Sequence, residues 1–177
     1  EKDGGSGLSR LDSTLVFEAL AMACPSVSAF ISIHNMCAWM ISQHGSKVIK
    51  EEFLEPMLKM DKICSYCLTE PNSGSDSAAL STSAEKTNDG FKLNGTKSFI
   101  SGGNFSDFYL SMVRTGAIGP KGISSVIVKK ENEGLSFGKP ERKMGWKSQP
   151  TAEVIFENCC VPAEHLLGEE NEGFVYA

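Results

Sequence analysis

The most informative segment of this chain reads Tyr66-Cys67-Leu68-Thr69-Glu70-Pro71-Asn72-Ser73-Gly74-Ser75-Asp76. It begins as a short apolar run that breaks at Pro71, and a loop of small hydroxyl and glycine residues follows. Such a loop lets backbone N–H groups approach a planar or anionic ligand closely, and Thr69, Ser73 and Ser75 add hydroxyls that can donate or accept. The segment predicts a ligand-binding loop at a strand end, although an ordinary strand followed by a surface turn would also fit these residues.

A second segment of similar character runs from Lys92 to Gly103. Strand alternation places Phe99 and Ser101 on one face and Ile100 on the other. An aromatic ring and a hydroxyl two residues apart, beside glycines at a strand end, suit a flat heteroaromatic ligand. Taken alone, these residues are better explained by a half-buried hairpin with Phe99 in the core.

Helical periodicity dominates the first third of the chain. Apolar spacings of three and four predict helices over 12–24, over 26–43 and from 46 to about Pro56. Asp12 or Ser13 is expected to cap the first helix. These helices must bury their apolar faces against one another or against the rest of the chain.

After Lys62 the apolar period changes to two, which predicts strands. Asn88-Asp89-Gly90 and Asn94-Gly95 are hairpin signals, since these residues tolerate positive φ. Helices followed by strands indicate an α+β fold, a helical part before an antiparallel β-barrel-like part. No Gly-x-Gly-x-x-Gly is present, so a bound dinucleotide would be held outside the Rossmann scheme. The predicted strands are 63–68, 82–87, 91–93, 96–101, 108–114, 122–129 and 153–161.

Composition and charge exclude several classes of function. The net charge of −5 argues against a nucleic-acid partner, and no apolar run approaches the roughly 20 residues that cross a bilayer.

The six cysteines lack the spacing of a secreted scaffold, so reduced thiols are expected. Cys64 and Cys67 form a C-x-x-C pair, but residues three apart in a strand face opposite sides. We therefore predict no metal site.

The histidines are predicted to have structural roles. His34 lies on an apolar helix face and His44 near the helix end, where a satisfied histidine or a partner of the helix dipole is expected. His165 follows Pro162 in a loop and is expected to face solvent.

The two segments together resemble acyl-CoA dehydrogenases. Each position at which that family's signature allows only certain residue types is matched in this chain, up to Ala79. An Asn-Gly-x-Lys-x-aromatic-Ile-Ser run, from Asn94 to Ser101, follows the signature at about the separation that is usual in the family. The run from Gly134 to Pro162 also follows the family. This resemblance covers nearly the whole chain. It implies part of an N-terminal helical domain at 1–62, a middle β domain at 63–165 and the start of a C-terminal helical domain at 166–177.

The resemblance also implies a site. Phe99 would shield the flavin of FAD, the Ser101 hydroxyl would face its N5, and Ser75 would in addition touch the acyl-CoA. Glu70 is not the family's base and is expected to support the loop by accepting backbone N–H bonds. The base lies in the family's C-terminal domain, so no catalytic residue is expected in this chain, which alone should be inactive. The implied cofactor-binding residues are Tyr66, Cys67, Leu68, Thr69, Ser73, Gly74, Ser75, Phe99, Ile100 and Ser101.

The implied reaction is α,β-dehydrogenation of an acyl-CoA, with a hydride passing to the flavin. Segments 31–41 and 145–151 resemble branched-chain members most, which implies isobutyryl-CoA as substrate and a place in valine catabolism. The resemblance further implies an electron-transfer flavoprotein partner, a homotetramer and the mitochondrial matrix. The alternatives are another short-chain dehydrogenase, an acyl-CoA oxidase relative or a non-catalytic scaffold. Because the chain starts without Met and ends within an apolar run, we expect it to be part of a longer protein.

Overall fold

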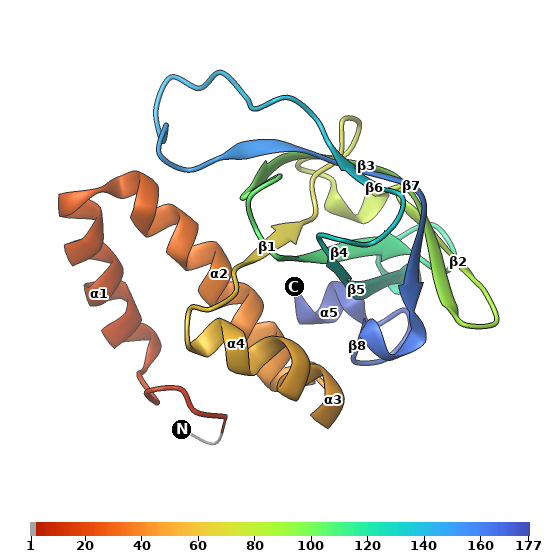
Figure 1. The fold of residues 1–177 in the computed structure, drawn as a ribbon, viewed down its shortest axis with the longest axis horizontal. Coiled ribbons are helices and arrows are strands. Elements are labelled where there is room, and N and C mark those ends of the chain that lie inside the picture. The colour runs from red at the N-terminus through yellow and green to blue at the C-terminus, as the bar shows by residue number, and fades with distance from the viewer. Residues whose placement is uncertain (1–2) are drawn as a thin grey trace.

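Helices and sheet form two separate parts of the molecule. The computed structural model describes residues 3–177, and Figure 1 shows the helices on one flank and the sheet on the other. A π-helical turn, Lys50–Leu54, joins the last two helices of the helical part. A short helix, α5 (Gly173–Tyr176), ends the chain and lies against the sheet at β5. The helical part comprises α1 (Arg10–Ala23), α2 (Pro25–His44), α3 (Lys47–Ile49) and α4 (Glu55–Leu58).

Helix α1 begins two residues earlier than predicted, because Ser9 is its N-cap. The Ser9 hydroxyl accepts a hydrogen bond from the Asp12 backbone N–H at 3.2 Å, and the Asp12 carboxylate accepts one from the Ser9 N–H at 2.9 Å. This reciprocal pair is a capping box, which satisfies two otherwise unpaired donors. Pro25 then opens α2 at a position where its missing N–H costs nothing.

The strands form one eight-stranded sheet in the order β6-β7-β3-β2-β4-β5-β8, with β1 paired to β4. The predicted α+β class with a helical part before the sheet is confirmed, and most neighbours are antiparallel. Two pairs are parallel, β1 with β4 and β2 with β4, so the sheet is mixed, and it does not close into a barrel. The strands are β1 (Cys64–Cys67), β2 (Ser83–Lys86), β3 (Gly90–Ser101), β4 (Phe108–Arg114), β5 (Ile123–Lys129), β6 (Leu135–Phe137), β7 (Thr151–Pro162) and β8 (Leu166–Leu167).

The predicted turn at Asn94-Gly95 is wrong. Strand β3 runs without interruption, and its register against β7 shifts between Leu93 and Gly95, which marks a bulge. Gly95 has φ +147°, and a Cβ there would lie 2.6 Å from the Thr82 hydroxyl oxygen. Glycine is needed here for a close approach of β3 to Thr82, which is a different use of the same residue from a hairpin.

Both faces of the central strands are buried. Phe108 and Leu110 of β4 pack with the helices, whereas Tyr109 and Val113 belong to a second core on the opposite face. The alternation of side chains along a strand explains this division. Cys64 and Cys67 are divided in the same way, one in each core, so the residues of the C-x-x-C pair do face opposite sides as predicted. Within the described residues, no group of three or more histidine, cysteine or acidic side chains could hold a metal ion, and no helix is long and apolar enough to span a membrane.

His165 does not face solvent as predicted. Only 4% of its surface is exposed, and its ring packs edge-on against Phe53 at 5.0 Å. The reason is the short strand β8 directly after it, which pairs with β5 and holds the preceding turn against the helical part. A strand of two residues is too short to be predicted from the apolar periodicity of the sequence.

The buried His34 ring joins helix α2 to the start of β1, which confirms its structural role. The Cys64 backbone N–H can only donate, so His34 Nδ1 accepts from it at 3.2 Å and Nε2–H donates to the Met57 carbonyl at 3.3 Å. This arrangement requires a neutral imidazole. Burial lowers the pKa of His34 below its usual value, although the Met57 carbonyl opposes that shift.

We expect the stability of the protein to fall as the pH drops below about 6.5, the ordinary pKa of histidine. A depressed folded-state pKa means that protonation favours the unfolded chain, so the stability present above 6.5 is lost as pH falls through the folded-state value. Urea unfolding at a series of pH values between 8 and 5 would measure this. The His34→Gln variant should show a shallower slope, and part of the slope should remain because burial also lowers the pKa of His165. An unchanged slope in His34→Gln would contradict this assignment.

Candidate functional site

One pocket of about 170 Å³ brings the two predicted segments together. The end of β1 supplies one wall, the end of β3 supplies another, and α2 closes the pocket with Ile33 and Met36. Ten residues were predicted for the site, and six of them lie here: Tyr66, Leu68, Thr69, Phe99, Ile100 and Ser101.

Backbone and side-chain hydrogen bonds hold the two walls side by side. The Ser98 N–H donates to the Thr69 carbonyl at 2.8 Å, and the Lys97 ammonium donates to the Leu68 carbonyl at 3.1 Å. The Ser65 hydroxyl donates to the Ser101 carbonyl at 2.5 Å. These three contacts tie the segment at 65–69 to the segment at 97–101, so the two walls form a single unit.

The other four predicted site residues do not line this pocket. Cys67 is fully buried in the sheet core, and Ser73 is buried with its hydroxyl donating to the Asp76 carbonyl at 2.6 Å. Gly74 and Ser75 are exposed on the loop beyond β1. The structure therefore separates the predicted residues into a pocket set and a loop set.

Phe99 is exposed over 68% of its surface and is not a core residue, so the half-buried hairpin explanation of this segment is wrong. Its φ of +59° is uncommon for a non-glycine residue, and the β3–β7 register shifts between Lys97 and Ile100. The resulting bulge turns the ring out beside the pocket while Ile100 stays buried. An exposed aromatic ring held in a strained backbone conformation is typical of a binding site.

Glu70 supports the loop, as predicted, and its carboxylate is almost fully buried. It accepts hydrogen bonds from the Ser81 N–H at 2.7 Å, the Ser81 hydroxyl at 2.8 Å and the Thr82 N–H at 2.9 Å. Its fourth donor, which the sequence did not indicate, is the fully buried Lys97 ammonium at 2.8 Å. Burial alone would raise the pKa of Glu70, but the bonds from Lys97, Thr82 and Ser81 together lower it to about 2.

Gln149 is a further residue that sequence analysis did not identify at the site. It lies in the long connection between β6 and β7, which Figure 1 shows reaching from the sheet towards the start of α2. Its side-chain N–H donates to the Ser101 hydroxyl, and its backbone N–H donates to the Ser26 hydroxyl at 3.1 Å. Only the tertiary structure could show this, because 48 positions separate Gln149 from Ser101 along the chain.

The pocket residues fit part of a flat ligand with a polar edge. Ile33, Met36 and Leu68 are apolar, Phe99 offers a ring, and Thr69 and Ser101 offer hydroxyls. The buried Tyr66 hydroxyl has no partner within the described residues. The volume is below the roughly 300–1,000 Å³ of pockets that enclose a drug-sized ligand. These residues can therefore cover one side of an isoalloxazine but cannot enclose it.

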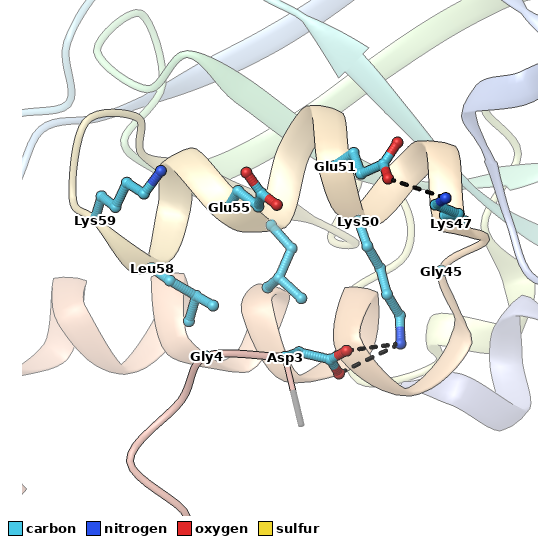
Figure 2. A pocket seen from close by; sticks show the side chains of 10 residues that line it. Asp3, Gly4, Gly45, Lys47, Lys50, Glu51, Glu55, Leu58 and Lys59 are labelled. Carbon is cyan, nitrogen blue, oxygen red and sulfur yellow. Dashed lines mark hydrogen bonds and ion pairs between the residues drawn. The ribbon is translucent and has the colours of Figure 1, made fainter. Parts of the chain in front are cut away.

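A larger groove of about 720 Å³ lies elsewhere, along α3 and α4 beneath the segment at Gly4. Figure 2 shows that charged side chains of both signs line it. One ion pair, Lys50 to Asp3 at 3.3 Å, spans the groove, and another, Lys47 to Glu51 at 3.6 Å, lies along the helical side. None of the predicted site residues lies there. Three lysines and three acidic side chains line the groove, so their charges balance and give it no preference for a ligand of either sign.

Comparison with known proteins finds two family models and several relatives that match this chain. Residues 1–61 match the family model of the acyl-CoA dehydrogenase N-terminal domain, and residues 65–159 match that of the middle domain. Mitochondrial isobutyryl-CoA dehydrogenase of Bos taurus is 55% identical over 98% of this chain and 42% of its own length. The protein of that name from Dictyostelium discoideum is 57% identical over the whole chain and 43% of its own length.

The solved structure of butyryl-CoA dehydrogenase from Megasphaera elsdenii has the same fold, with a TM-score of 0.93 and 38% identity. The comparison covers 99% of this chain and 47% of that one. The chain thus spans less than half the length of these relatives. Both family models and the fold confirm the resemblance of the two segments, and the chain belongs to the acyl-CoA dehydrogenase family.

Proposed function

We propose that this chain forms the flavin-binding face of an FAD-dependent dehydrogenase that acts on a short branched-chain acyl-CoA. The observation that carries this proposal is the convergence of β1 and β3 on one pocket, with the Phe99 ring exposed beside it. Isobutyryl-CoA is the proposed substrate, because the two relatives named for that substrate are more than half identical to this chain.

The pocket set and the loop set would have different roles. Phe99 would cover one face of the flavin ring, Thr69 and Ser101 would hydrogen-bond its edge, and Ser75 on the exposed loop would contact the acyl-CoA. When bound, FAD supplies the hydride acceptor that dehydrogenation of a saturated acyl group requires. The residues proposed to hold it remain Tyr66, Cys67, Leu68, Thr69, Ser73, Gly74, Ser75, Phe99, Ile100 and Ser101.

Proton abstraction needs a group from outside residues 1–177. The eight residues that line the pocket include no carboxylate. Glu70 is nearby in sequence, but with a pKa of about 2 and four donors it has little tendency to accept a proton. A general base works best with a pKa near the operating pH. We therefore assign no catalytic residue to this chain and expect the base in a C-terminal helical domain.

The remaining features of the proposal follow from the family. We propose domain limits of 1–62 and 63–165, with 166–177 opening the C-terminal helical domain, and an electron-transfer flavoprotein as electron acceptor. The mitochondrial matrix is proposed as the location because both isobutyryl-CoA dehydrogenase relatives are described as mitochondrial. A homotetramer and a place in valine catabolism are proposed from the family resemblance alone.

The decisive test is flavin reduction in the full-length protein. We expect purified protein to carry a yellow flavin spectrum and isobutyryl-CoA to bleach it without oxygen. Reoxidation by an electron-transfer flavoprotein, with little oxygen consumption, would separate a dehydrogenase from an oxidase. The Phe99→Ala variant should bind FAD about 5- to 150-fold more weakly, because a stacked ring contributes about 1–3 kcal/mol. The matched control, Phe105→Ala, removes an exposed ring outside the pocket. Bound flavin that no short acyl-CoA bleaches would contradict the proposed activity.

A further inference from the structure

We propose that Gln149 is a positioning residue that aims the Ser101 hydroxyl into the pocket and thereby adjusts the electron affinity of the flavin. This inference deepens the proposed function and rests on it. Gln149 does not line the pocket itself, so it acts only through Ser101.

The direction of the Gln149–Ser101 hydrogen bond leaves the serine hydroxyl free to donate its proton elsewhere. The Gln149 side-chain N–H donates and the Ser101 oxygen accepts. A hydroxyl has one proton to donate and two lone pairs. With a lone pair occupied by Gln149, the proton stays available for an acceptor in the pocket that Ser101 lines. Donation to an acceptor atom at the ring edge withdraws electron density, which favours the reduced flavin.

Gln149 has little freedom to move away from Ser101. It is 98% buried, since only 2% of its surface is exposed. Its backbone N–H donates to the Ser26 hydroxyl at 3.1 Å, and its carbonyl accepts from the Lys143 ammonium at 2.5 Å. The next residue, Pro150, accepts a hydrogen bond from the Gly102 N–H at 2.8 Å. Contacts from α2, from the connection itself and from the end of β3 therefore fix the amide beside Ser101.

The other end of the amide, the Gln149 side-chain oxygen, is buried and has no partner within the described residues. An unsatisfied buried acceptor costs about 1–3 kcal/mol. Among the described residues, Ser101 is the hydrogen-bond partner of this side-chain amide, and the nitrogen end is the one that faces the hydroxyl. An apolar residue of the same length would fill the same space without an unsatisfied buried acceptor. We therefore infer that glutamine at this position serves its contact with Ser101.

The test uses FAD-loaded full-length protein and measures the midpoint reduction potential of its flavin. In Gln149→Met, which keeps the length but loses the donor, the preference for reduced over oxidised FAD should fall between about twofold and tenfold, the range of one hydrogen bond. A tenfold change corresponds to about 30 mV for a two-electron couple. Gln149→Glu, which can only accept, commits the hydroxyl proton to itself and should lower the potential further.

The same two substitutions in a Ser101→Ala background provide the control. If Gln149 acts through Ser101, the Gln149→Met shift should almost vanish there, and the coupling in this double-mutant cycle should equal most of the single-variant effect. Equal shifts in both backgrounds, or no shift in either, would overturn the inference while FAD binding and bleaching by substrate still supported the proposed function. Should the unsubstituted protein bind no FAD, both would be overturned. Gln149→Met folds without a buried charge, so it decides the outcome if Gln149→Glu is unstable.

Discussion

Replacing Lys97 with methionine should lower the free energy of unfolding by about 3–5 kcal/mol, the usual cost of removing one partner from a buried ion pair. Both charged groups are almost entirely inaccessible, with 0% of the Lys97 side chain and 4% of the Glu70 side chain exposed. The variant would leave the Glu70 carboxylate buried with its backbone donors but without a counter-charge. It would also remove the donor to the Leu68 carbonyl, one of the contacts between the two walls of the pocket.

Chemical denaturation of the variant would measure this loss, and two further variants make the result specific. Lys86→Met removes an exposed lysine that pairs with Glu170 at 3.1 Å, and it should change stability by less than about 1 kcal/mol. The double variant Lys97→Met with Glu70→Gln should recover part of the lost stability, because no uncompensated charge then remains buried. A cost below about 1 kcal/mol for Lys97→Met alone would mean that this ion pair does not hold the loop in place.

Local chemistry allowed much of the fold to be predicted. Helix α2 and strand β4 came out close to their predicted limits, because apolar spacing and the flanking Pro and Gly residues mark their ends. The errors arose where pairing between distant segments decides the outcome. Asn94-Gly95 has the chemistry of a turn, yet pairing with β7 keeps β3 continuous through it, with a bulge. The parallel pairing of β1 with β4 also depends on residues more than forty positions apart.

Contacts between distant segments limit the prediction of the site even more than that of the fold. Strand alternation and the motif put Phe99 and Ser101 at a strand end, and the structure confirms that their segment meets the segment at Tyr66. The residues that position them were missed. Lys97 was only one position of the motif and Gln149 had no predicted role, because their partners lie 27 and 48 positions away in sequence. A single sequence carries no signal for such contacts, and only the fold reveals them.

Truncating Phe53 to alanine should cost about 3–5 kcal/mol, the range for deleting a fully buried aromatic side chain. Phe53 belongs to the π-helical turn of the helical part and is 0% exposed. Its ring packs edge-on against Phe108 of β4 at 4.9 Å and against His165 at 5.0 Å, and the Lys129 ammonium lies 5.8 Å from its centre. The cavity would therefore open between the helices and the sheet.

The position of this cavity makes a second outcome measurable. Because α2 closes the pocket whose other walls come from the sheet, loosening the contact between the two parts should weaken FAD binding even though Phe53 is not a pocket residue. Phe105→Ala serves as the control for stability, since its ring is 55% exposed and should cost far less. Equilibrium unfolding followed by both tryptophan fluorescence and circular dichroism would show whether helices and sheet still unfold together. If Phe53→Ala lost stability but kept the FAD affinity of the unsubstituted protein, the pocket would depend on the sheet alone, and the part assigned to α2 would be wrong.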